Sequence, residues 1–161
     1  MGLGYMALAA ARAARAGKGL QEIAAEVESM VPKMHVWFLV DTLKYLAKGG
    51  RIGGAEALLG SMLAIKPLLQ VENGKVETLD KVRTRGKAIE RLVERFKKEC
   101  DGRPVHCTVI NAIAPEEAEQ LKNMVLTAFP QVQDLMITGV SAAIGTHVGP
   151  LALGLCFYTD W

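Results

Sequence analysis

The chain has 161 residues, 50% of them hydrophobic, which is enough for one globular domain with a substantial core. Its 19 lysine and arginine residues nearly balance 17 aspartate and glutamate residues, leaving a formal net charge of +2 at pH 7. Such a balanced charge argues against a protein that binds nucleic acid through general electrostatic attraction. Any site for an anion is therefore expected to be local.

The three cysteines, Cys100, Cys107 and Cys156, are widely spaced and lack the paired spacing of zinc sites or thiol–disulfide motifs. We therefore expect a cytoplasmic protein without a metal or other cofactor. The apolar stretch over 1–11 has no basic residue ahead of it and is soon interrupted by arginines, unlike a secretory signal. No stretch is apolar over the length that a membrane-spanning helix needs, so stable membrane insertion is not expected.

Two helices are expected at the N-terminus, over 6–16 and 20–30, because both stretches are rich in helix-forming residues. Gly17 and Gly19 separate the two helices, since glycine commonly ends a helix. Pro32 is expected to close this helical segment.

The sequence divides near residue 34 into a helical segment, 1–33, and an α/β domain, 34–161. The domain is expected to begin with a strand over 35–40, a short apolar run rich in β-branched and aromatic residues.

A glycine-rich loop over 49–54 separates two further predicted helices. We expect Asp41 to cap the first, which ends at Lys48. The second, over 55–64, is apolar on almost every face, and such a helix is normally buried. It could be plain core or the wall of a tunnel for a long apolar ligand.

A β-hairpin is expected over 68–72 and 75–82, because Asn73-Gly74 readily takes the positive φ angles of a tight type I′ turn. Over 85–100, apolar residues recur at helical spacing opposite a charged face, which predicts an amphipathic helix.

The remaining pattern predicts strands over 105–110, 132–138 and 151–158, and a helix that opens at Pro115. A loop rich in glycine, serine and threonine, which contains His147, is expected between the last two strands. The fold class is therefore a two-layer α/β domain with a mixed sheet, because an antiparallel hairpin accompanies helical crossovers.

Basic residues gather around the predicted start of the 85–100 helix: Lys81, Arg83, Arg85 and Lys87. A helix N-terminus already carries a positive dipole end, so cations there are unfavourable unless an anion or an acidic protein surface compensates. The same pattern also fits a solvated strand end.

His147 lies between glycines in the segment 145–150, where the backbone could approach a ligand closely and the imidazole could bind a carboxylate. A loop histidine also occurs without any special role. The glycine loop with Arg51 could cradle phosphate, although it lacks the Walker A lysine and fits a structural turn better. No nucleophile elbow, zinc motif or convincing Ser-His-Asp set indicates an enzyme.

Four separated segments resemble motifs of the DegV family, in the family's order. They are Asp41-Thr42-Leu43-Lys44-Tyr45-Leu46 with Gly49-Gly50-Arg51-Ile52, Leu58-Leu59-Gly60-Ser61 with Ile65-Lys66-Pro67, Lys81-Val82-Arg83-Thr84-Arg85, and His147-Val148-Gly149-Pro150 with Leu153-Gly154-Leu155.

The resemblance implies a carrier rather than an enzyme. DegV proteins hold one long-chain fatty acid in a tunnel between two domains and present its carboxylate to the catalytic subunit of a fatty acid kinase. The implied carboxylate ligand is His147, with Thr146 beside it and Arg83 at the tunnel mouth. The implied tunnel lining is Leu59, Met62 and Ile65, and the implied surface for the kinase is Arg83, Arg85 and Lys87.

Two features depart from the family's pattern. Family members are nearly twice as long, so the chain resembles their C-terminal half and would be a truncated form or a fragment without the first domain. Leu151 also stands where the family usually has glycine, which could crowd the segment near His147. A half-tunnel left open would expose an apolar surface, so a homo-oligomeric interaction module without a ligand is the alternative function. A phosphate-handling enzyme built on the 49–54 loop is a third possibility that the sequence does not favour.

Overall fold

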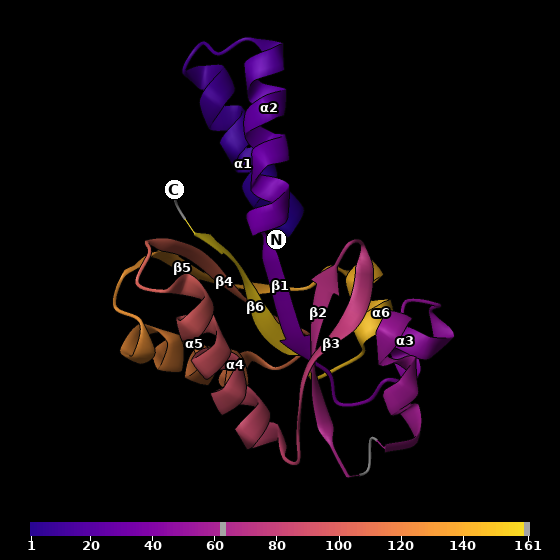
Figure 1. Cartoon of the computed structure of the whole chain (residues 1–161). Helices are drawn as coiled ribbons and strands as arrows, with labels where there is room; N and C mark the ends of the chain where they lie inside the picture. The colour runs from indigo at the N-terminus through magenta and orange to yellow at the C-terminus, as the bar shows by residue number, and fades with distance from the viewer. Residues whose placement is uncertain (62–63, 160–161) are drawn as a thin grey trace.

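The computed structural model of the chain describes residues 1–61 and 64–159 (Figure 1). Its elements in chain order are α1 (Gly2–Arg15), α2 (Leu20–Met30), η1 (Val31–Lys33), β1 (His35–Leu39), α3 (Lys44–Lys48), η2 (Gly53–Ser61), β2 (Lys66–Glu72), β3 (Lys75–Val82), α4 (Arg85–Cys100), β4 (Val105–Asn111), α5 (Pro115–Ala128), β5 (Val132–Gly139), α6 (Ala142–Val148) and β6 (Leu153–Thr159). The six strands form one sheet in the order β3-β2-β1-β6-β4-β5. Strands β4 and β5 are parallel and the other neighbours antiparallel, so the predicted mixed α/β sheet is confirmed.

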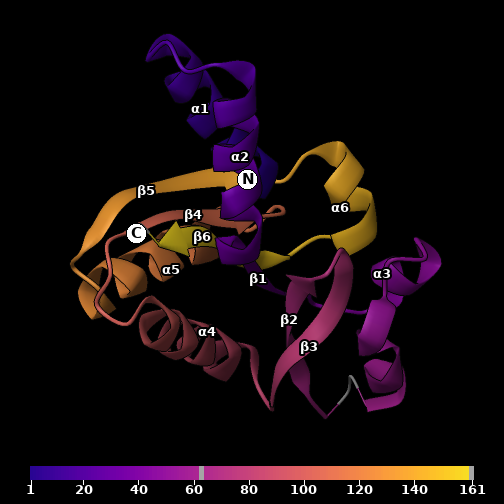
Figure 2. The same cartoon turned by 45° about the horizontal axis from the view of Figure 1, so that its top comes forward.

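Helices α4 and α5 form a layer on one face of the sheet (Figures 1 and 2). Along β1, Trp37 and Leu39 point to this face, while Phe38 and Val40 belong to the core on the other side, as the two-residue period of a strand requires. Phe96 of α4 is fully buried in the first core, where its ring meets that of Phe157 edge-on at 4.9 Å. The predicted amphipathic helix over 85–100 is thus confirmed.

The opposite face of the sheet carries shorter elements: α3, η2 and α6. Leu46 of α3, Leu58 of η2 and Val148 of α6 pack there against Phe38 and Val40. These elements gather at one end of the sheet and leave part of this face uncovered. The uncovered part contributes to an apolar pocket.

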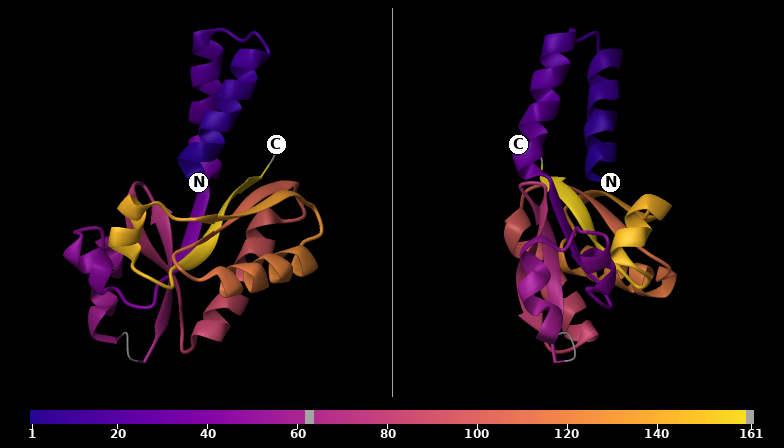
Figure 3. Two further views of the ribbon diagram at one scale, coloured as in Figure 1. Left: turned by 180° about the vertical axis from the view of Figure 1, so that it is seen from behind. Right: turned by 90° about the vertical axis from the view of Figure 1, so that its right-hand side faces the viewer.

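The first two helices form a hairpin that projects away from the sheet in every view (Figures 1 and 3). Tyr5 of α1 anchors the base of this hairpin, because its hydroxyl shares a 2.6 Å hydrogen bond with Thr108 Oγ1 and its ring contacts Tyr158 edge-on at 5.1 Å. Burial raises the pKa of Tyr5 well above its ordinary value. Both N-terminal helices were predicted from the sequence, and α2 has the predicted bounds.

The hairpin of β2 and β3 turns at Asn73 and Gly74, whose φ angles are +50° and +75°. These are the positive values of a type I′ turn, so this prediction is confirmed. Thr84 caps α4, because its Oγ1 accepts a hydrogen bond from the Lys87 amide at 3.3 Å.

Two local predictions near the third helix are wrong. Residues 55–64 were expected to form one buried α-helix, but the structure has a 3-10 helix over Gly53–Ser61, with buried Ala55 and Leu58 and an exposed Leu59. Glycines at both ends of this stretch favour a short, tight helix instead of several α-turns, because glycine has a poor helix propensity.

Asp41 does not cap α3, whose N-cap is Leu43. The Asp41 carboxylate instead lies 3.7 Å from Lys66 Nζ, which also donates to the Asp41 carbonyl at 3.3 Å. Thr42 Oγ1 accepts from the Lys44 amide at 3.2 Å and takes over part of the expected capping role. Within residues 1–61 and 64–159, no helix has the length and apolar character that crossing a membrane demands.

Candidate functional site

Segments that are far apart in the sequence converge at the end of the sheet that carries α3 and α6. Gly49, after α3, lies so close to α6 that a Cβ atom there would stand 2.1 Å from His147 Nδ1. Gly149 has a φ angle of +75°, and a Cβ atom there would stand 2.3 Å from the Tyr45 ring. Glycine is therefore required at both positions, because a side chain on either would separate α3 from α6.

His147 lies in the last turn of a short helix, where the sequence predicted an irregular loop. Ser141 explains the difference, because its Oγ accepts a hydrogen bond from the Ile144 amide at 3.4 Å and caps α6. The His147 Nδ1 atom is buried and has no hydrogen-bond partner among the described residues. Gly49 therefore packs against Nδ1 without a hydrogen bond, and the imidazole keeps a ring nitrogen that can take part in binding a ligand.

His147 lines a pocket of about 410 Å³ on the uncovered part of the sheet. The floor includes Phe38 of β1 and Ile110 of β4, and Ile144 of α6 contributes to a wall. His147 and Arg51 are polar groups in a lining that is otherwise apolar among the described residues. An apolar cavity of this size with a few polar groups is typical of a site for a small amphiphilic molecule.

Arg51 lines the pocket, in a glycine-rich loop that the sequence predicted to be a structural turn in preference to a phosphate site. Its guanidinium Nη1 donates to the Gly49 carbonyl at 3.2 Å, which holds the side chain across the turn. The close contact of Gly49 with α6 confirms the structural turn, and Arg51 of the same loop also lines the pocket.

Several residues expected to bind the ligand do not line this pocket. Thr146 is exposed, and its hydroxyl donates to the Ala143 carbonyl at 2.8 Å. Leu59 is 40% exposed, and Ile65 packs against the core below η2. Met62 lies outside the described residues. Among the described residues the lining comes from strands of the sheet, α6 and the region around α3, and none of it from 55–61 or 64–65, since η2 packs beside β3.

The basic residues near the start of α4 fall into two groups. Arg85 is committed to internal contacts, since its Nε and Nη2 atoms each donate to the Glu117 carboxylate at 2.7 Å. Its Nη2 also donates to the Leu151 carbonyl at 2.6 Å. This hydrogen bonding lowers the pKa of Glu117. Arg83 and Lys87 are exposed and form no ion pair with any described residue, so their charges remain available to an anionic partner.

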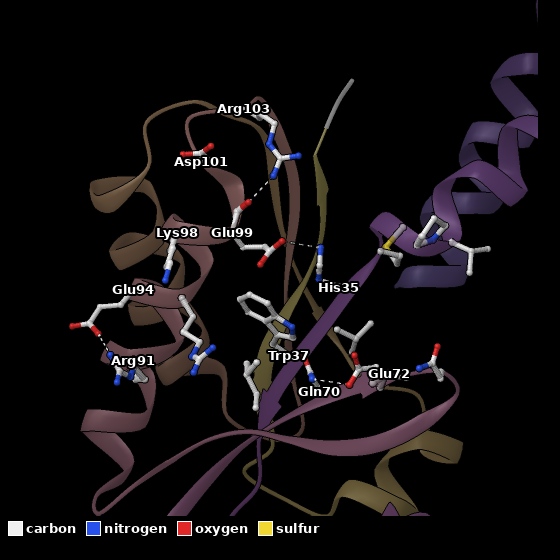
Figure 4. A pocket seen from close by; sticks show the side chains of 18 of the residues that line it. His35, Trp37, Gln70, Glu72, Arg91, Glu94, Lys98, Glu99, Asp101 and Arg103 are labelled. Carbon is white, nitrogen blue, oxygen red and sulfur yellow. Dashed lines mark hydrogen bonds and ion pairs between the residues drawn. The ribbon is translucent and has the colours of Figure 1, made fainter. Parts of the chain in front are cut away.

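A larger opening of about 1500 Å³ lies between α4 and strands β1 and β2 (Figure 4). Two pairs of its polar side chains interact: Arg91 Nη1 donates to Glu94 at 3.0 Å, and His35 Nε2 lies 3.7 Å from Glu99 Oε1. Burial lowers the pKa of His35, although the Glu99 carboxylate opposes this shift. Because charged side chains line much of it, this groove suits an acyl chain less well than the smaller apolar pocket does.

The chemistry of the cysteines is that of buried structural residues. Cys100, Cys107 and Cys156 are free and buried, and burial raises the pKa of Cys100 to about 12 and that of Cys156 to about 11. Such thiols stay protonated and unreactive. Residues 1–61 and 64–159 contain no cluster of three histidine, cysteine or acidic residues that could hold a metal ion.

Sequence comparison identifies relatives over nearly the whole chain. The profile of the DegV family, described as uncharacterised proteins, matches residues 1–160. A DegV domain-containing protein of Streptomyces coelicolor is 46% identical over 155 residues, which are 96% of this chain and 55% of that protein. Protein DegV of Bacillus subtilis is 36% identical over 156 residues, 96% of this chain and 55% of the relative. The chain thus spans about half the length of the curated relatives that it matches.

Solved structures share the fold. A fatty-acid-binding DegV family protein from Thermus thermophilus matches 99% of this chain with 57% of its own, at a TM-score of 0.93 and 32% identity. The structure of DegV, a fatty-acid-binding protein from Bacillus subtilis, matches 99% of this chain with 57% of its own, at a TM-score of 0.85 and 35% identity. This chain belongs to the DegV family.

Proposed function

We propose that this chain binds a long-chain fatty acid, with the acyl chain in the 410 Å³ pocket and the carboxylate at His147. The observation that carries the proposal is the pairing of an apolar pocket with a histidine whose buried Nδ1 has no partner among the described residues. An imidazole can donate a hydrogen bond to a carboxylate, and the apolar walls can bury the hydrocarbon chain. The fatty-acid-binding relatives in Thermus thermophilus and Bacillus subtilis support the same ligand class.

Arg51 supports the carboxylate from the rim of the pocket in this proposal. Its guanidinium cannot lose its charge, and burial of an acyl chain nearby would strengthen its attraction for the head group. Thr146 stays a proposed ligand only if its hydroxyl leaves the Ala143 carbonyl when the fatty acid binds. Leu59 and Ile65 would likewise contact the fatty acid only if their side chains turned toward its acyl chain.

The second step of the proposal is presentation of the bound carboxylate to a fatty acid kinase. The unpaired charges of Arg83 and Lys87 offer a surface to such a partner, whereas Arg85 is held by Glu117 and contributes by fixing the backbone at Leu151. In this proposal the chemistry of phosphoryl transfer belongs to the partner. In this proposal the chain corresponds to the C-terminal half of its longer relatives and acts in the cytoplasm.

The test begins with lipid extraction of the purified chain and mass spectrometry, which we expect to detect a long-chain acid. His147→Ala should weaken binding of an added fatty acid about tenfold or more, because hydrogen bonds to charged groups contribute about 1.5–3 kcal/mol. The thermal midpoint should change little, since Nδ1 makes no hydrogen bond within the described residues.

His147→Gln is the matched control, because glutamine keeps a nitrogen donor of similar reach and should recover part of the affinity. A chain that carries no lipid and is not stabilised by added fatty acid would exclude the proposed function. Equal losses of affinity and stability in His147→Ala would instead assign the histidine to the fold.

Self-association remains the second candidate function, and one observation favours it. Helix α1 contains no acidic residue and no lysine, and it exposes Leu3 by 82% and Leu8 by 45%. Soluble proteins normally cover such apolar side chains by association. This surface lies on the projecting hairpin, separate from the pocket on the sheet (Figure 3).

A further inference from the structure

Four residues other than glycine have left-handed backbone angles: Asn73, Asp101, Ile113 and Leu151. Asn73 turns the hairpin and Asp101 ends α4, and both residue types tolerate this conformation. Ile113 with a φ angle of +57° and Leu151 with +62° do not, because their Cβ atoms crowd the backbone. Strain of this kind is concentrated at functional sites and persists only where the surrounding structure enforces it.

The two strained residues lie side by side. The Leu151 amide donates to the Ala112 carbonyl at 2.7 Å, and the Ala112 amide donates to the Ala152 carbonyl at 2.8 Å, so the pairing of β4 with β6 continues into both loops. These bonds explain how the backbone angles are held. They do not explain why the side chains are large and apolar, since glycine or asparagine would adopt the same angles at lower cost.

Both side chains are directed into solvent, with Ile113 exposed by 81% and Leu151 by 41%. Burial of these side chains within the described structure therefore does not offset the free-energy cost of the backbone strain. An exposed pair of aliphatic residues on a backbone held by cross-loop hydrogen bonds is already rigid, and rigidity reduces the entropy lost when a partner covers it.

The surroundings of this pair are basic. Arg85 Nη2 donates to the Leu151 carbonyl at 2.6 Å and brings the start of α4 next to the pair. Arg83 and Lys87 flank that helix start and form no ion pair with the described residues, whereas the first turn of α5 carries Glu116 and Glu117, of which Glu117 binds Arg85. Leu151 directly precedes Ala152 and Leu153, which line the pocket, so the pair lies at the border of the pocket.

We propose that Ile113 and Leu151 form an apolar anchor that inserts into a socket of a protein partner whose rim carries carboxylates. The inference rests on the proposed function, in which that partner is the catalytic subunit of the fatty acid kinase. A second copy of this chain is a poor occupant, because it would bring the same unpaired cations against Arg83 and Lys87. The anchor therefore positions the kinase at the mouth of the pocket.

The experiment measures binding of the purified catalytic subunit of the fatty acid kinase to the chain by surface plasmon resonance. Ile113→Asp and Leu151→Asp should each weaken binding at least about tenfold, mainly through faster dissociation. Arg83→Gln combined with Lys87→Gln should slow association and reduce its dependence on salt. The matched control is Leu20→Asp on α2, since Leu20 is 78% exposed and lies away from this surface.

A second pair of variants separates docking from folding. Ile113→Gly and Leu151→Gly should raise the thermal midpoint, because they relieve the backbone strain, and should still weaken kinase binding. A residue with only a structural role would not combine gained stability with lost affinity.

Three outcomes would overturn the anchor. Kinase binding that the aspartate and glycine substitutions of Ile113 and Leu151 all leave unchanged would reject it while leaving the proposed function intact. A chain that binds fatty acid but no kinase would reject both the anchor and the presentation step, yet not the fatty acid site. Loss of self-association in Ile113→Asp, without loss of kinase binding, would assign the surface to a second copy.

Discussion

The contact between Gly49 and His147 shows how one missing side chain can position a functional residue. The Nδ1 atom of the imidazole fills the place where a Cβ atom of residue 49 would stand. This contact holds the ring without a hydrogen bond to Nδ1, in a position where His147 lines the pocket.

Gly49→Ala should therefore displace the histidine. Residue 49 has a φ angle of −80°, which alanine adopts easily, so the effect would come from the clash at 2.1 Å alone. We expect fatty acid binding to weaken about tenfold and the free energy of unfolding to fall by about 1–3 kcal/mol.

Gly86→Ala is the matched control, because a Cβ atom there meets nothing within 4 Å and alanine favours the helix by about 0.5–1 kcal/mol. Isothermal titration calorimetry and urea unfolding of both variants measure the two effects. Wild-type affinity in Gly49→Ala would show that the position of the imidazole does not govern binding.

At the level of elements, one ion pair ties α4, α5 and the segment before β6 together. Arg85 on the first turn of α4 binds Glu117 on the first turn of α5 and the Leu151 carbonyl. The side chains of Arg85 and Glu117 are 21% and 30% exposed, so the pair is shielded more than an ordinary surface pair. The sequence suggested an anion site at Arg85, and the structure shows that a carboxylate of the chain itself occupies it.

This ion pair predicts a specific dependence of stability on pH. Because Arg85 lowers the pKa of Glu117 in the folded state, the contribution is present above the unfolded value of about 4.3 and is lost as the pH falls through the lower folded value. Glu117→Gln should reduce the free energy of unfolding by about 1–2 kcal/mol at pH 7, and the difference from the wild type should vanish in acid.

Glu119→Gln is the control for this prediction, since Glu119 forms an exposed pair with Lys122 and should matter by less than about 0.5 kcal/mol. Urea unfolding between neutral pH and acid measures both variants. A constant difference for Glu117→Gln across that range would contradict the assigned role of its charge.

At the scale of the molecule, the projecting helical hairpin is the largest departure from a compact domain (Figure 3). Its base is anchored through Tyr5, Met30 and Cys156, but the outward face of α1 has no partner among the described residues. This surface and the pocket lie on different parts of the molecule, so association and fatty acid binding can be tested separately.

We expect the chain to form dimers or larger assemblies at micromolar concentration through this face. A double substitution, Leu3→Glu with Leu8→Glu, should shift the chain toward the monomer in light scattering, because it places charges in the apolar contact. Leu126→Glu, at a site that is 42% exposed on α5, is the control and should leave the assembly unchanged. A wild-type chain that is strictly monomeric would exclude this mode of association.

Local patterns in the sequence determined most of the elements. Asn73-Gly74 specified its turn through backbone angles that few residue pairs adopt, and the apolar spacing over 85–100 specified α4 through the face that it buries. Both signals depend on neighbouring residues alone. The prediction of an α-helix over the glycine-containing stretch 53–60 was wrong, because the type of helix formed there depends on the close packing of η2 beside β3.

The site itself was decided by tertiary structure. His147 was a candidate from its motif, but its neighbour Gly49 and the pocket residues Arg51 and Phe38 come from segments about a hundred residues away, joined by the strand order of the sheet. Likewise, no local pattern pairs Arg85 with Glu117, because the distance between their helices is set by the core beneath them. Periodicity and turn chemistry act along the chain, whereas a binding site is made by contacts across it.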